Sequence, residues 1–172
     1  MTIGLSLENF TILHTVISLV QLVSGLVVVW GLTTSHSNGG WTAIYLVSAI
    51  LTCITGFMFP VTAFLPSHAV GILSLILLAI AIIALYGRHL AGAWRWVYAV
   101  SIVISVYFSA FVTVVQSFLK VPALHALAPA GSEPPFSITQ GVVLVLFIVA
   151  GIGAIRRFHP ELRTHQHGAF AR

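Results

Sequence analysis

The sequence predicts an all-α integral membrane protein, a bundle of five transmembrane helices, and three observations lead to this fold class. Of its 172 residues, 59% are hydrophobic and only 6% are charged, whereas soluble proteins average about 45 to 50% and about 25%. The apolar residues gather in five continuous stretches, each long enough for a membrane-spanning helix of about 20 residues. Short alternating segments, typical of transmembrane strands, do not occur. The composition excludes a water-soluble globule, and without a basic face the chain is not expected to bind nucleic acid.

The five predicted spans follow the beginnings and ends of the apolar runs. They cover Phe10 to Leu32, Trp41 to Pro60, His68 to Tyr86, Ala93 to Leu119 and Ser137 to Ile155. Because backbone groups in lipid have to be hydrogen-bonded within their own segment, each run is expected to be a helix. The first run follows no Lys or Arg and is too long for a signal peptide, so we expect it to be retained. The predicted membrane domain is residues 1–155, and residues 156–172 form a basic tail.

The segments between the spans carry residues that end helices. The polar run TTSHSNGG, residues 33–40, predicts a turn and therefore a hairpin of the first two spans. Pro60 and Pro66 bracket the second connection, where Ser67 is expected to be the N-cap of the third span. Residues 87–92 form a short third connection. The fourth, residues 120–136, contains four prolines, which predict a long loop without a regular helix.

Positive charges predict the orientation of the spans. When five crossings are threaded alternately, six arginines fall on one side of the membrane and Lys120 alone on the other. The positive-inside rule makes the arginine side cytoplasmic, so the N-terminus and the 120–136 loop are expected in the periplasm and the C-terminus in the cytoplasm. An aromatic belt near the cytoplasmic interface agrees with this topology: Trp30, Trp41, Tyr86, Trp94, Trp96 and Tyr98. In the tail, Arg156, Arg157 and Arg163 are expected to bind the anionic lipid surface, with a solvated tail as the alternative.

Polar residues inside the spans recur at helical spacing and so mark the inward faces. In the first span this stripe is Thr11, His14, Ser18, Gln21 and Gly25. The second span has Tyr45, Ser48, Thr52 and Thr55, and the fourth has Tyr98, Ser101, Ser105, Ser109 and Gln116. Packing between helices accounts for the small members of these stripes, because small residues are the usual contact surface of helices in membranes.

Larger polar side chains toward the periplasmic ends of the spans, and in the loop above them, are the candidate binding residues. A polar group left unpaired in hydrocarbon is costly, so each needs a partner or a ligand. The candidates are His14, Gln21, His68, Tyr107, Gln116, His125, Glu133 and Gln140. Their placement predicts one periplasm-facing cavity inside the bundle. The 120–136 loop is expected to cover it, with His125 or Glu133 reaching into the opening.

The predicted cavity suits a small lipophilic ligand or a cofactor. His14 and His68 are candidate axial ligands of a haem, since imidazole is a common haem ligand. His14 with Gln116 or Gln140 has the donors that the carbonyls of a quinone require. Histidines simply satisfied at helix interfaces, without any ligand, are the simpler interpretation. The sequence has no Asp and lacks the HExxH, CxxC and CxxCH patterns, which argues against carboxylate-rich metal sites.

Other functional classes have less support in the sequence. Transporters usually carry charges in mid-membrane or inverted repeats, and neither is found. Nucleophile and phosphate-loop motifs are also missing, so the sequence carries no prediction of enzymatic activity. The alternative to a ligand-binding protein is a non-enzymatic accessory or assembly subunit. Its polar stripes would then contact a membrane-protein partner or a second copy of the chain. Both hypotheses place a multi-pass protein in the bacterial inner membrane.

Overall fold

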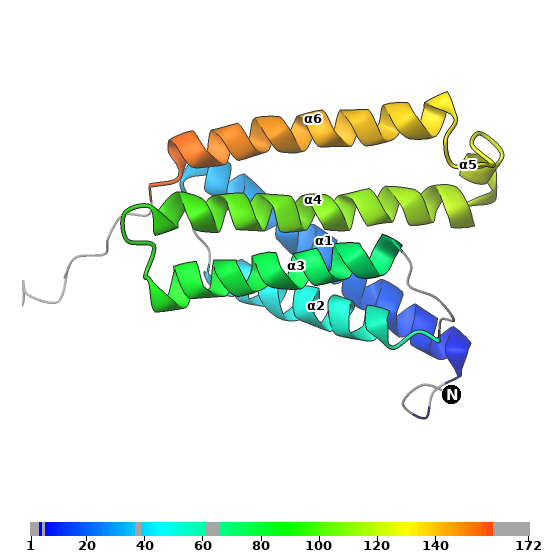
Figure 1. Cartoon of the computed structure of the whole chain (residues 1–172), viewed down its shortest axis with the longest axis horizontal. Coiled ribbons are helices and arrows are strands. Elements are labelled where there is room, and N and C mark those ends of the chain that lie inside the picture. Colours follow the sequence, from blue (N-terminus) through cyan, green and yellow to red (C-terminus); the bar gives the residue numbers. More distant parts are fainter. Residues whose placement is uncertain (1–3, 5, 37–38, 61–65, 160–172) are drawn as a thin grey trace, which may run out of the picture.

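The computed structural model describes residues 4, 6–36, 39–60 and 66–159, and within them the chain is helical with connecting turns (Figure 1). Five helices among the described residues are long and apolar enough to cross a membrane, which confirms the all-helical class and the predicted number of such helices. The elements are α1 Leu7–Thr34, α2 Gly39–Phe57, α3 Pro66–Ile82, the π-helical turn η1 Ile83–Gly87, α4 Trp94–Lys120, α5 Pro122–His125 and α6 Pro134–Arg157.

Helix α1 is longer than its predicted span because both of its ends are capped. The Ser6 hydroxyl accepts a hydrogen bond from the Asn9 backbone N–H at 3.2 Å, which satisfies one of the free donors of the first turn. At the other end, Ser35 adopts a left-handed conformation with φ 60°, and its N–H donates to the Gly31 carbonyl. The helix therefore begins at Leu7 rather than Phe10 and ends at Thr34 rather than Leu32.

Prolines occupy the first turns of three helices, and this corrects two predictions. Helix α3 begins at Pro66, so Ser67 is a helical residue and not the expected N-cap. Helix α6 begins at Pro134, and the one-turn helix α5 begins at Pro122 inside the 120–136 segment. Proline fits a first turn because its missing N–H would have no helical partner there and its φ is already helical. The loop between α4 and α6 is consequently shorter than predicted and partly helical.

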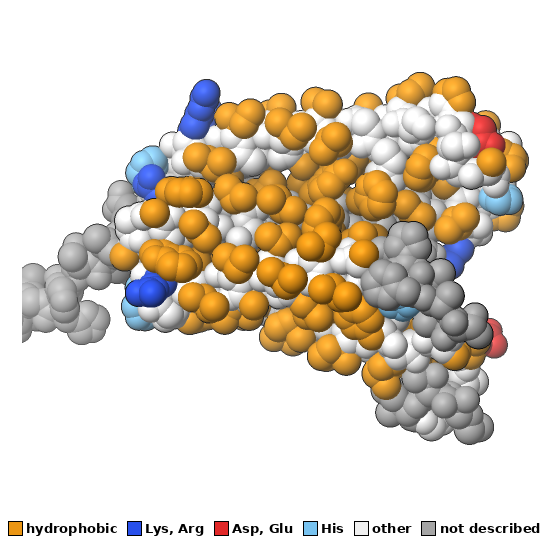
Figure 2. Space-filling view, in the orientation of Figure 1, with side chains coloured by type: hydrophobic (Ala, Val, Ile, Leu, Met, Phe, Trp, Pro, Cys, Tyr) orange, Lys and Arg blue, Asp and Glu red, His pale blue; other side chains and the backbone are white. Residues whose placement is uncertain are grey.

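Helices α1 and α4 form the centre of the bundle. Helix α1 packs against α2, α4 and α6, and α4 packs against α1, α3 and α6. In Figure 1, α1 crosses the bundle at an angle, so that the first turns of α1 and α6 lie at opposite edges of the molecule. The core lies between the helices and includes the fully buried Tyr45, Ala49, Ile102 and Val106. Hydrophobic side chains also cover the outer surface between the two ends (Figure 2), as a lipid-facing surface requires.

Charged side chains lie at the two ends of the bundle (Figure 2). Arg88 follows η1, Arg95 is in the first turn of α4, and Arg156 and Arg157 are in the last turn of α6. These helix ends meet at one end of the molecule, which we call the arginine end, whereas Lys120 is at the far end of α4. The structure thus separates the charges of the described residues as the threading predicted. Arg163 lies outside the described residues, as does the rest of the 160–172 segment.

Candidate functional site

Gln21, the largest polar side chain in the middle of α1, is paired with α4. Its exposed fraction is 4%, and its amide Nε2 donates to the Ser109 hydroxyl at 2.5 Å. One α-helical turn earlier in α4, the Ser105 hydroxyl accepts a hydrogen bond from the Tyr45 hydroxyl of α2 at 2.8 Å. The predicted polar stripes of α1, α2 and α4 therefore do face one another. Gln21 and Tyr45 are satisfied by bonds that hold three helices together, which is a common role of polar groups in membrane bundles.

His14 is paired with α2 near the end of the bundle that contains Lys120. Its Nδ1 lies 2.7 Å from the Thr55 hydroxyl. Because that hydroxyl also lies 2.7 Å from the Leu51 carbonyl, to which its single proton is directed, we assign the donated proton of the pair to His14 Nδ1. The imidazole also stands edge-on to Phe59 at a ring-centroid distance of 5.2 Å. One nitrogen of His14 is thus used in helix packing, and Nε2 is an acceptor in this tautomer.

His68 contacts a different side of α2 from His14. Its ring stacks on Phe57 at a centroid distance of 5.8 Å and an interplanar angle of 14°. Phe57 follows Thr55, the partner of His14, by two residues. This step is a rotation of about 200° around the helix axis, so the two side chains point in nearly opposite directions. The described contacts of both rings are packing contacts, and axial ligation of a haem by His14 and His68 stays a prediction. The described residues also contain no group of three or more His, Cys, Asp and Glu placed to hold a metal ion.

The two remaining glutamines and Tyr107 lie on other parts of the bundle. The Gln140 amide donates to the Phe111 carbonyl at 3.2 Å, and its Oε1 is buried without a partner among the residues that the structure describes. Gln116 is exposed on α4. Tyr107 packs against Phe147 of α6. Gln140 and Tyr107 thus belong to the contact of α4 with α6, whereas His14 belongs to the contact of α1 with α2.

Glu133 organises the loop before α6. Its carboxylate accepts hydrogen bonds from the backbone N–H groups of Ala130 at 2.9 Å and Ser132 at 3.0 Å. The bond from Ala130, followed by the others, holds the pKa of Glu133 below its ordinary value, because these donors favour the charged carboxylate. His125 ends α5 and is exposed. In this structure both residues shape or border the loop.

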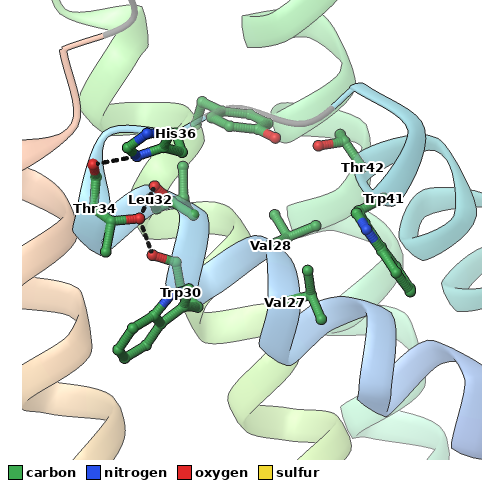
Figure 3. Close-up of a pocket in the computed structure, with 10 residues that line it drawn as sticks. Val27, Val28, Trp30, Leu32, Thr34, His36, Trp41 and Thr42 are labelled. Atoms are coloured by element: carbon green, nitrogen blue, oxygen red, sulfur yellow. Dashed lines mark hydrogen bonds between the residues drawn. The ribbon is translucent and has the colours of Figure 1, made fainter.

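A crevice lies at the arginine end of the described residues. It has a volume of about 410 Å³ and lies between the last turns of α1 and the first turn of α2, beside Tyr98 of α4. We call it the hairpin crevice. Its lining residues are Val27, Val28, Trp30, Gly31, Leu32, Thr34, His36, Trp41, Thr42 and Tyr98. Figure 3 shows Trp30 and Trp41 at opposite sides of this space, with Val27 and Val28 between them.

The rim of the hairpin crevice is exposed and aromatic, and its floor is buried. Trp30 is 71% exposed and Trp41 39%, whereas Thr42 is 6% exposed and Tyr98 3%. The hydroxyls of Thr42 and Tyr98 interact with each other, so the floor carries a polar group within an apolar wall. At the upper edge His36 Nδ1 is hydrogen-bonded to the Thr34 carbonyl at 2.8 Å (Figure 3). The volume falls in the range of small-molecule sites, about 300 to 1,000 Å³.

The hairpin crevice was not predicted from the sequence. The sequence indicates Trp30, Trp41 and Tyr98 as parts of an aromatic belt at the membrane interface, and Tyr98 also as part of the polar stripe of the fourth span. The available signal was that Trp30 and Trp41 flank the turn of one hairpin, which places both residues at the same end of the bundle. Comparisons with protein-family models, with curated proteins and with solved structures found no match for this chain.

Proposed function

We propose that this chain is a multi-pass protein of the bacterial inner membrane that binds a small lipophilic molecule, and that the hairpin crevice is its binding site. The observation that carries the proposal is the crevice itself, an apolar, aromatic-walled space with the Thr42 and Tyr98 hydroxyls on its floor. Binding sites for small molecules are typically apolar with few polar groups that orient the ligand. A flat ring with a carbonyl, as in a quinone, matches these features.

The periplasm-facing cavity around His14 stays a prediction. The described contacts there support packing, since His14 is paired with Thr55 and His68 is stacked on Phe57. The hairpin crevice supports the same function, binding of a lipophilic ligand, at the opposite end of the bundle. No step of the proposal depends on a haem.

The proposed topology places the arginine end, and with it the hairpin crevice, at the cytoplasmic interface. It is supported by the four described arginines at that end, while the described carboxylates, Glu8 and Glu133, are at the other. Arg156 and Arg157 are exposed and suited to lipid phosphates. A C-terminal fusion to a fluorescent protein should be bright and a fusion to a periplasmic phosphatase inactive. The reverse pattern would overturn the topology.

Fluorescence quenching tests the binding site. In a background with Trp94→Phe and Trp96→Phe, the emission comes from Trp30 and Trp41, and a short-chain benzoquinone that enters the hairpin crevice should quench it saturably. Val27→Phe fills the crevice from a residue that is 36% exposed, so its added bulk should not disturb the core. We expect it to weaken quinone binding at least about tenfold, equivalent to about 1.4 kcal/mol.

The matched control is Val23→Phe. Val23 precedes Val27 by one turn on the same helix, is 56% exposed and does not line the crevice. It should bind the quinone like the parent chain. Equal affinity of the parent, Val23→Phe and Val27→Phe, or quenching that only rises linearly with quinone, would refute the hairpin crevice as the site.

A non-enzymatic accessory or assembly subunit is the second candidate function, and the satisfied polar pairs favour it. Gln21 with Ser109 and Tyr45 with Ser105 use the polar stripes for packing, as a scaffold protein would. The partner would be another membrane protein or a second copy. Cross-linking in intact membranes followed by mass spectrometry tests this function. A chain that remains monomeric and uncross-linked while it binds the quinone would exclude it.

A further inference from the structure

A second apolar groove runs between α4 and α6, which lie side by side (Figure 1). It has a volume of about 260 Å³ and shares no lining residue with the hairpin crevice. We call it the α4–α6 groove. Its walls include Ile104 and Tyr107 from α4 and Leu144 and Phe147 from α6. Gly151 lies at its base, where an added Cβ would be 3.5 Å from Val103, so the absence of a side chain deepens the groove.

Tyr107 supplies the one hydroxyl group on the wall of this groove. It stands at the midpoint of α4, which runs from Trp94 to Lys120, and therefore at mid-membrane depth. Its ring is fixed edge-on against Phe147 at 5.7 Å. Its hydroxyl makes no hydrogen bond with any residue that the structure describes. By contrast, the hydroxyl of Tyr45 in the core of the same bundle has a partner within the chain, because it donates a hydrogen bond to the Ser105 hydroxyl at 2.8 Å.

The described residues supply no partner for the Tyr107 hydroxyl, so a bound molecule is needed to supply one. Water is scarce at this depth, and an unpaired polar group in hydrocarbon is unfavourable. A lipid acyl chain cannot accept the bond, because its ester oxygens lie near the interface. No backbone carbonyl of the described residues accepts a hydrogen bond from the Tyr107 hydroxyl either. The complementary occupant is a molecule that is apolar overall and carries a hydrogen-bond acceptor.

We infer that the α4–α6 groove binds a lipophilic aromatic ketone or quinone, whose carbonyl accepts a hydrogen bond from the Tyr107 hydroxyl. The ring of the ligand fits against Phe147 and over the bare backbone of Gly151, where a flat molecule has room. This site is distinct from the hairpin crevice, and the inference does not depend on ligand binding in the hairpin crevice. Tyr107 orients the ligand, and binding requires no chemical step.

Tyr107→Phe tests the inference because it removes only the hydroxyl. The full chain in lipid nanodiscs is titrated with a short-chain benzoquinone labelled with ¹³C at its carbonyls, and with an alkylbenzene of equal length that has no carbonyl. Loss of one hydrogen bond should weaken quinone binding by about three- to tenfold and leave the alkylbenzene unaffected. The infrared C=O band of bound quinone should lie at lower frequency in the parent chain than in Tyr107→Phe.

Two further variants distinguish ligand binding in the α4–α6 groove from general effects of a substitution on the bundle. Leu144→Trp fills the groove from a residue that is 42% exposed, while Leu146→Trp adds the same bulk at a 62% exposed residue outside it. Leu144→Trp should weaken binding of both probes in the groove. Leu146→Trp and Val27→Phe should leave unchanged the part of the infrared shift that is lost in Tyr107→Phe. An unshifted band in the parent chain, or equal quinone affinity in Tyr107→Phe, would overturn the inference. So would cross-linking that places a second copy's helix in the groove.

Discussion

Gly25 lies where α1 contacts both α2 and α4, and we predict that Gly25→Ala destabilises the bundle. A Cβ at this position would lie 2.9 Å from both Tyr45 Cε2 and Val106 Cγ2. Real Cβ contacts are rarely shorter than about 3.4 Å, and both neighbours are fully buried. Neither ring nor methyl group has free space into which it can move. The methyl group therefore forces the three helices apart or twists the side chains out of their preferred rotamers.

The expected magnitude follows from two opposing effects. Alanine is favoured over glycine within a helix by about 1 kcal/mol, whereas an extra methyl group in a packed core costs about 1 to 3 kcal/mol. Displacing the Tyr45 ring also weakens its bond to Ser105, and such bonds in membranes contribute about 0.6 kcal/mol on average. We expect a net loss of about 1 to 2 kcal/mol in the free energy of unfolding.

Unfolding in mixed micelles of a mild detergent and dodecyl sulfate, followed by circular dichroism, measures this free energy. Gly141→Ala is the control, because no atom lies within 4 Å of a Cβ at that helical position, so the helix preference of alanine acts alone. Val106→Ala should cost less in the Gly25→Ala background than in the parent, since it removes one of the two clashes. If Gly25→Ala is as stable as Gly141→Ala, the close three-helix contact at Gly25 is refuted.

Three further predictions concern one hydrogen-bonded pair, one loop and one backbone conformation. A double-mutant cycle of Tyr45→Phe and Ser105→Ala should give a coupling of about 0.6 kcal/mol in the same unfolding assay, and no coupling would mean that their bond does not form. The lowered pKa of Glu133 implies that its charged form holds the loop, so the hydrogen-exchange protection of the Ala130 amide should be present at neutral pH and fall as the pH drops through that pKa. Glu133→Gln should lack this pH dependence, and a loop equally protected in both forms would contradict it. His89 is exposed with φ 50°, so His89→Gly should raise stability by about 1 kcal/mol and His89→Val should lower it.

The spans were predictable from the sequence because their length and apolar character are local properties. A run such as Ala93 to Leu119 can be compared directly with the thickness of a bilayer, and α4, Trp94–Lys120, matches it within one residue at each end. The ends of α1 and α6 were less predictable. They depend on the Ser6 cap and on the first-turn prolines of α6, whose effects reach beyond the apolar run.

The sequence by itself determined that the chain forms five apolar helices, which faces of these helices are polar, and that the four described arginines lie at one end. These follow from composition and from a repeat of 3.6 residues, which need no knowledge of neighbours. Only the tertiary structure decided which stripes meet. Helical periodicity indicates that Gln21 faces inward, but the crossing of α1 over α4 selects Ser109 as its partner, and the hairpin turn brings Trp30 and Trp41 to one crevice. Partners depend on crossing angles and on helix order, which arise from the packing of all five helices at once.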